Sequence, residues 1–152
     1  MPLGASHTAQ GINFAIFSRH AQAVSLVVAV DGRKRRQWEL PLDPRHHKTG
    51  DIWHISLGGA PTNLRYGYRL DGPWEPEGSG LAFDCRAILL DPYAREIHSP
   101  DWGHERSCLG SEPCCLVESD VYDWEGDRPL NTPLKDSIIY ELHVRGFTRH
   151  PS

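Results

Sequence analysis

Apolar residues recur at every second position through much of the amino-terminal part of the chain, which is the spacing that β-strands require. In residues 11–18 the apolar positions on one face are Ile12, Phe14 and Ile16. In residues 24–30 they are Val24, Leu26, Val28 and Val30, and Asp31-Gly32 then predicts a hairpin turn. Further short strands are predicted at 37–42, 52–57, 66–70 and 87–90. About six short strands with no amphipathic helix among them predict an all-β fold, an immunoglobulin-like antiparallel β-sandwich.

The pattern changes after residue 98. Residues 99–136 are rich in Pro, Gly, Cys, Asp and Glu and show neither the strand nor the helix period, so we interpret them as an irregular linker. Residues 137–147 are nearly continuously apolar, as in a parallel strand that is covered on both faces. Such a strand needs neighbours, and none follows before Ser152. We therefore expect a sandwich at 1–98, a linker at 99–136, and the truncated start of a larger domain at 137–152.

The charge balance argues against polyanionic partners. The formal net charge is −4, and the one basic run, at residues 33–36, directly follows the predicted hairpin turn, so nucleic-acid binding is not expected. No segment approaches the ~20 apolar residues of a membrane span, and the first residues lack the pattern of a signal peptide. The sequence therefore predicts a cytoplasmic protein without a membrane segment.

The four cysteines are Cys85, Cys108, Cys114 and Cys115. We expect reduced thiols, because a chain of this size does not need disulfides to fold and adjacent cysteines do not easily bridge each other. A zinc site with His98 and His104 is the alternative, but the spacing differs from the paired C-x2-C pattern. We predict no metal and no cofactor.

A family resemblance is carried by many segments in order rather than by any one of them. They include Tyr66-Gly67-Tyr68-Arg69, Leu89-Leu90-Asp91-Pro92-Tyr93-Ala94 and Asp123-Trp124-Glu125-Gly126-Asp127. The full set covers nearly the whole chain, at residues 2–5, 11–18, 50–54, 66–69, 72–74, 89–94, 123–127, 129–133 and 139–148. Together these segments resemble the glycogen debranching enzymes and isoamylases of glycoside hydrolase family 13.

The resemblance implies a domain order and a chemistry. Residues 1–98 resemble carbohydrate-binding module family 48, the sandwich that precedes the (β/α)8 barrel in these enzymes, and residues 137–152 resemble the first strand of that barrel. The parent protein is then expected to be a glycoside hydrolase acting on α-1,6 linkages with two carboxyl groups ~5–5.5 Å apart. In the family those residues stand on later barrel strands, so we expect no catalytic residue in this chain.

Glu141 and His143 share one face of the predicted barrel strand, at positions i and i+2. One interpretation is that they act as a local acid and base. Active sites of barrels draw on several strands at once, however, so we assign both residues a structural role.

Glycan binding would depend on exposed aromatic rings, because flat rings stack on the C–H faces of neutral sugars. Trp74 is the first candidate, since Asp71-Gly72-Pro73 places it in a turn and related glycogen-binding modules carry a stacking Trp after a similar hairpin. Trp38, Arg69 and Tyr68 are predicted to complete the surface. Trp53 is in phase with Ile55 and Leu57 and is expected in the core.

The leading hypothesis is a noncatalytic domain that supports the catalytic barrel of a debranching hydrolase and can contact α-glucan. Two departures from the pattern of glycogen-binding relatives favour this supporting role. Where relatives often carry an Arg-Phe-Asn-Pro segment and a Lys, this chain has Ala82-Phe83-Asp84-Cys85 and Ala87, and it lacks a Trp-bearing loop after the second strand. The alternatives are an autonomous glucan-binding module, the amino-terminal domain of a maltooligosyltrehalose trehalohydrolase, and an immunoglobulin-like domain unrelated to sugar. The expected partners are the chain's own barrel, α-glucan and, through residues 138–147, a second copy.

Overall fold

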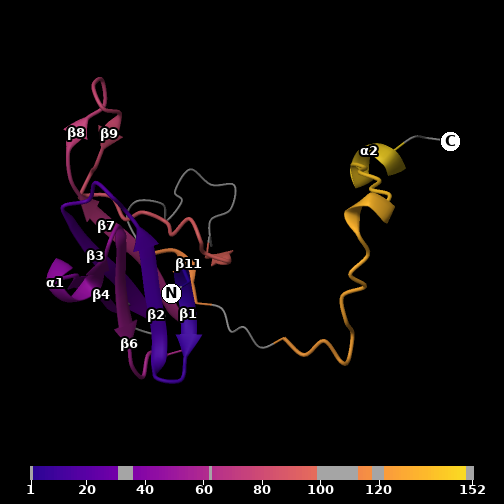
Figure 1. Ribbon diagram of the computed structural model, residues 1–152, viewed down its shortest axis with the longest axis horizontal. Coiled ribbons are helices and arrows are strands. Elements are labelled where there is room, and N and C mark those ends of the chain that lie inside the picture. The colour runs from indigo at the N-terminus through magenta and orange to yellow at the C-terminus, as the bar shows by residue number, and fades with distance from the viewer. Residues whose placement is uncertain (1, 31–35, 62, 99–112, 118–121, 150–152) are drawn as a thin grey trace. The chain divides into compact units, whose positions relative to one another are not determined.

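The computed structural model describes residues 2–30, 36–61, 63–98, 113–117 and 122–149 (Figure 1). They belong to two compact units, Met1–Asp120 and Val121–Ser152. No helix among the described residues is long and apolar enough to cross a membrane.

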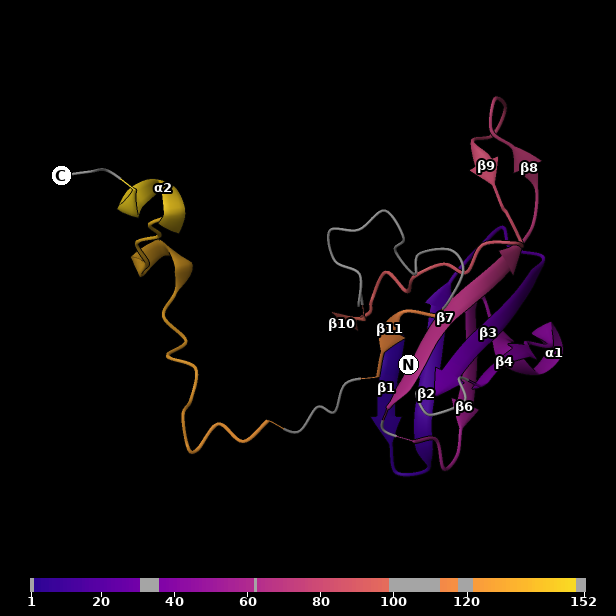
Figure 2. The same ribbon diagram turned by 180° about the vertical axis from the view of Figure 1, so that it is seen from behind.

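The first unit is built from two antiparallel sheets, which confirms the predicted all-β sandwich (Figures 1 and 2). One sheet has the order β1-β2-β6-β5, from Gly4–Thr8, Gly11–Phe17, Ile52–Leu57 and Lys48–Thr49. The other has the order β10-β11-β7-β3-β4, from Glu96–Ile97, Cys115–Leu116, Leu64–Asp71, Ala23–Val30 and Arg36–Pro41. A short helix, α1 (Pro44–His47), connects β4 to β5, and a separate hairpin is formed by β8 (Trp74–Glu75) and β9 (Leu81–Ala82).

The strands that sequence periodicity predicted are those with one apolar face. Residues 11–18, 24–30, 37–42, 52–57 and 66–70 correspond to β2, β3, β4, β6 and β7. The predicted strand at 87–90 is reduced to an isolated bridge between Leu89 and Tyr68. Strand β1 was missed because its sequence, Gly-Ala-Ser-His-Thr, has no apolar alternation; it exists through pairing with β2.

The core lies between the two sheets. Ile12 and Phe14 of β2 are 2% and 0% exposed and face residues of β7, and the rings of Phe14 and Tyr66 meet edge to face at 5.0 Å between centroids. Trp53 is 1% exposed, which confirms its predicted place in the core. Burial of each such large side chain contributes about 1.5–3 kcal/mol to the hydrophobic stabilisation of the sandwich.

The second unit contains no strand among its described residues. A single 3-10 turn, η1, covers Leu134–Asp136, residues 137–143 have no regular structure, and Val144–Thr148 forms helix α2. The strand predicted at 137–147 is therefore not formed here. The physical reason is that a parallel strand is held by hydrogen bonds to neighbouring strands, which the described residues of this unit do not supply. In agreement with this, Ile138 of the segment is 99% exposed.

Candidate functional site

Trp74 lies on β8 and is 61% exposed, so its ring is available to a ligand. It pairs across the hairpin with Ala82, and the hairpin projects beyond the end of β7 (Figure 1). The prediction that Trp74 is exposed is confirmed, but the residue lies on a strand of the hairpin and not in a turn.

Trp38 lies on the edge strand β4 and is 45% exposed. With Leu40, Leu57 and other apolar residues it lines an open groove of about 500 Å³. Its register partner is Val28, in the half of β3 that lies away from the β8–β9 hairpin. The groove of Trp38 and the hairpin of Trp74 are therefore different places on the sandwich.

Arg69 has structural partners. Its Nε donates to Glu39 Oε2 at 3.3 Å, and one Nη donates to the carbonyl oxygens of Cys85 and Arg86 at 2.8 and 2.6 Å. These bonds hold the loop after β9 against the outer face of the sheet. Because neighbouring residues on a strand face opposite sides, the contact with Glu39 places Trp38 on the other face from Arg69.

Tyr68 is 1% exposed and lies in the core, where burial raises the pKa of its hydroxyl. It offers no ring to a ligand in this structure, so it is removed from the predicted surface. The physical reason is its phase on β7, which matches that of the core residues Tyr66 and Leu70. The four predicted residues thus do not form one site.

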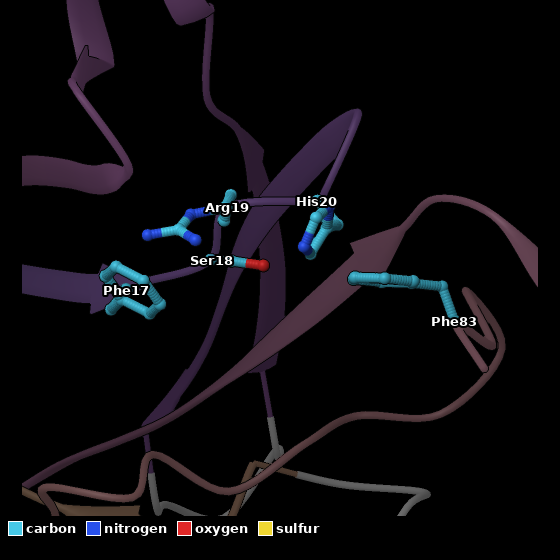
Figure 3. A pocket seen from close by; sticks show the side chains of 5 residues that line it. All are labelled: Phe17, Ser18, Arg19, His20 and Phe83. Atoms are coloured by element: carbon cyan, nitrogen blue, oxygen red, sulfur yellow. The ribbon is translucent and has the colours of Figure 1, made fainter. Parts of the chain in front are cut away.

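A pocket that the sequence analysis did not identify lies near the base of the β8–β9 hairpin. It has a volume of about 330 Å³ and is lined by the end of β2 and the residues after it, together with one residue after β9: Phe17, Ser18, Arg19, His20 and Phe83. Figure 3 shows the Phe83 ring directed toward His20, with Phe17 and Arg19 on the opposite side of Ser18. Phe17 is 51% exposed.

Hydrogen bonds fix the backbone beneath this pocket. The Ser18 N–H donates to the Asp51 carbonyl at 2.9 Å, and the indole Nε1 of the buried Trp53 donates to the Ser18 carbonyl at 3.2 Å. The Arg19 Nε donates to Asp51 Oδ2 at 2.9 Å. The Arg19 guanidinium also lies 6.0 Å from the centroid of the Phe17 ring, within the range of a cation–π contact.

Phe83 is held from the opposite side of the pocket. Its N–H donates to the Pro73 carbonyl at 3.3 Å, and a Cβ added to Gly72 would stand 2.9 Å from its Cγ. Only a glycine leaves room for the ring there. The signal that could have revealed this pocket is Phe17, a large aromatic residue in the polar phase of β2; nothing in the local sequence places Phe83 beside it.

Asp91 forms a buried polar cluster beneath β7. Its carboxylate, in a residue only 3% exposed, accepts from the Tyr66 hydroxyl at 2.9 Å and from the Tyr93 N–H at 2.8 Å. The latter bond, from a backbone N–H two residues further along the chain, is typical of a turn-forming aspartate, and Asp84 makes the same kind of bond with the Arg86 N–H. Burial raises the pKa of Asp91 above its ordinary value, and it raises the pKa of the nearby Cys115 thiol to about 11.

The cysteines do not all follow the sequence prediction. Cys85 and Cys115 are free thiols, but Cys114 is disulfide-bonded, so the expectation of reduced thiols is wrong at that position. Neighbouring side chains in an extended segment point to opposite sides, which allows Cys114 and Cys115 different partners. Cys108, like His104, lies outside the described residues. Within the described ranges, no group of three His, Cys, Asp or Glu side chains is arranged to hold a metal ion.

Glu141 and His143 are not on a strand here. The His143 Nδ1 accepts from the Gly146 N–H at 3.0 Å and caps the start of α2, a structural contact of the kind that favours helix initiation. This geometry gives the pair no acid–base arrangement.

Comparison with known proteins adds a family and a fold. The family model of carbohydrate-binding module 48 (isoamylase N-terminal domain) matches residues 2–94. The chain is 40% identical to chloroplastic isoamylase 1 of Arabidopsis thaliana and 40% identical to the glycogen debranching enzyme of Salmonella typhi, in each case over 99% of this chain. It spans only 20% and 24% of the lengths of these relatives.

Solved structures of pullulanases share the fold. The crystal structure of Paenibacillus barengoltzii pullulanase in complex with maltohexaose and α-cyclodextrin matches with a TM-score of 0.62 and 22% identity, over 99% of this chain and 20% of that one. Pullulanase from Bacillus acidopullulyticus matches with a TM-score of 0.55 and 18% identity, over 84% of this chain and 13% of that one. At these identities the likeness concerns the fold alone.

Proposed function

This chain belongs to the carbohydrate-binding module 48 family, the isoamylase N-terminal domain, and on that premise we propose that it is the noncatalytic amino-terminal domain of a cytoplasmic glycosidase that hydrolyses α-1,6 linkages in glycogen-type glucans. The observation that carries the proposal is 40% identity across 99% of the chain with an isoamylase and a glycogen debranching enzyme. The names of both relatives agree with the leading hypothesis, a debranching hydrolase, and favour it over the alternative of a maltooligosyltrehalose trehalohydrolase.

In this proposal the sandwich supports one rim of the catalytic barrel. The exposure of the segment that resembles the barrel-opening strand favours this proposal, because Ile138 and Ile139 are 99% and 78% exposed in the chain by itself. Such apolar residues gain stabilisation only when a partner covers them. In the longer protein, residues 137–147 become the first strand of the barrel between neighbouring strands.

Activity toward branched and unbranched polymers tests the enzymatic part. Protein expressed from the complete gene should release reducing ends from glycogen but not from unbranched amylose, whereas the 152-residue chain should release none from either. A full-length protein that leaves glycogen intact, or that cleaves both polymers equally, contradicts the proposal. Reducing-end release by the 152-residue chain itself contradicts the noncatalytic assignment.

A second role, direct contact with α-glucan, is favoured by one observation: the Trp74 ring is 61% exposed on its own hairpin. Retardation of the 152-residue chain during electrophoresis through glycogen, lost in Trp74→Ala, supports this role. Trp124→Ala is the matched control, because Trp124 is 65% exposed but lies in the other unit. Unretarded migration of the unmodified chain favours a purely supporting sandwich.

A further inference from the structure

The pocket between Phe17 and Phe83 combines two aromatic rings with polar side chains on a fixed backbone. The rings come from segments far apart in the sequence, and Ser18, Arg19 and His20 lie between them (Figure 3). Its volume of about 330 Å³ is at the lower end of the ~300–1,000 Å³ range of small-molecule sites. These dimensions suit a small ligand with an apolar face and polar edges.

The charges at this pocket favour a neutral ligand. The positive charge of Arg19 is compensated by Asp51, whose carboxylate accepts from Nε at 2.9 Å. The Arg19 side chain is nevertheless 64% exposed, and a guanidinium carries five N–H donors, of which Nε supplies only one. The pocket therefore offers hydrogen-bond donors without a net charge, which fits hydroxyl groups better than phosphate.

The pocket and Trp74 lie at the same end of the sandwich. Phe83 directly follows β9, and β9 pairs with β8, which carries Trp74. The Phe83 N–H is bonded to the Pro73 carbonyl, so the pocket wall and the base of the hairpin are physically joined. The two places are therefore linked through the segment that contains β8 and β9.

We propose that the pocket formed by Phe17, Ser18, Arg19, His20 and Phe83 is a second contact site for α-glucan, in which a glucosyl unit stacks on the exposed Phe17 ring. Arg19 and Ser18 donate hydrogen bonds to its hydroxyl groups, and Phe83 closes the far side. This inference rests on the glucan-binding part of the proposed function. Two contacts on one linear glucan reinforce each other, because binding at the first raises the local concentration at the second.

The test separates the pocket from Trp74. In the Trp74→Ala variant of the 152-residue chain, backbone amide NMR signals of residues 17–20 and 83 should shift upon titration with maltoheptaose. Phe17→Ala in that background should lower the affinity roughly two- to tenfold, as loss of one aromatic contact does. Phe17→Trp should retain it, and Tyr93→Ala, at a residue 54% exposed elsewhere on the sandwich, should leave it unchanged.

Each outcome decides something. Shifts confined to the β8–β9 hairpin of the unmodified chain overturn the pocket and leave Trp74 as the glucan contact. No shift anywhere overturns both the pocket and the glucan-binding role, while the debranching assignment is still tested by reducing-end release. Shifts at residues 17–20 with inorganic phosphate but not with maltoheptaose overturn the pocket as a sugar site. A spectrum of Phe17→Ala that has lost its dispersion calls for Phe17→Leu, which keeps the apolar volume and removes the ring.

Discussion

Tyr66→Phe should lower the free energy of unfolding by about 2 kcal/mol, within the ~1.5–3 kcal/mol that hydrogen bonds to charged groups contribute. The lost hydroxyl donates to Asp91 Oδ2 at 2.9 Å, and both residues are almost fully buried. The ring and its edge-to-face contact with Phe14 remain, so the change isolates the hydrogen bond. Urea unfolding followed by circular dichroism should show a midpoint lowered by roughly 1 M at a slope of about 2 kcal/mol per M.

Tyr68→Phe is the matched control. Tyr68 lies two residues away on β7 and is 1% exposed, but its hydroxyl has no hydrogen-bond partner among the described residues. Removing an unsatisfied buried hydroxyl should cost nothing and can stabilise the fold by up to ~1 kcal/mol. Equal destabilisation by the two changes, or a larger loss at Tyr68, would refute this account of the buried cluster.

Three further outcomes are expected. Burial raises the folded-state pKa of Asp91. The contribution of this residue to stability is therefore fully present below the ordinary Asp pKa of about 3.9 and is lost as the pH rises through the folded-state pKa. In urea titrations, the excess stability of the unmodified chain over Asp91→Asn should decline above pH ~4. Gly11→Ala should unfold far more easily than Gly50→Ala on thermal melting, because an added Cβ would clash with the Leu57 carbonyl oxygen in the first case. In the second case it would meet nothing within 4 Å, and only left-handed strain of about 1–2 kcal/mol applies. The exposed apolar segment of the second unit should make the chain self-associate, and Ile139→Lys should reduce the mass measured by light scattering at high concentration; a concentration-independent monomer in the unmodified chain would count against this.

The sandwich could be predicted from sequence because one-sided strands carry their own signature. Residues such as Ile12, Phe14 and Ile16 recur with period two, and each falls on the core face in the structure. Elements without that signature could not be predicted. Strand β1 forms because β2 offers hydrogen-bonding groups to it, and β11 forms beside β7 through a register that depends on distant parts of the chain.

The candidate site, like the fold, was predicted from the sequence only in part. The sequence indicated that Trp74 would be exposed, since it follows Gly72-Pro73 in a turn. It also grouped Trp38, Arg69 and Tyr68 with Trp74, and this grouping failed because adjacent strand positions face opposite sides and because Trp38 and Trp74 lie in different parts of the sandwich. The type of a residue indicates that it can bind sugar, whereas its phase on the strand and its position in the sandwich decide which residues come together in one site.

Local patterns in the sequence were sufficient to predict the main one-sided strands, the antiparallel class of the sandwich and its family, because alternation and motif order are local properties of the chain. Tertiary structure alone decided that Phe83 stands across a pocket from Phe17, that Arg69 is held by Glu39 and two carbonyl groups, and that the hydroxyl of Tyr66 has a partner while that of Tyr68 has none. Such contacts join residues separated by tens of positions. They depend on the register and packing of two sheets, which no local pattern encodes.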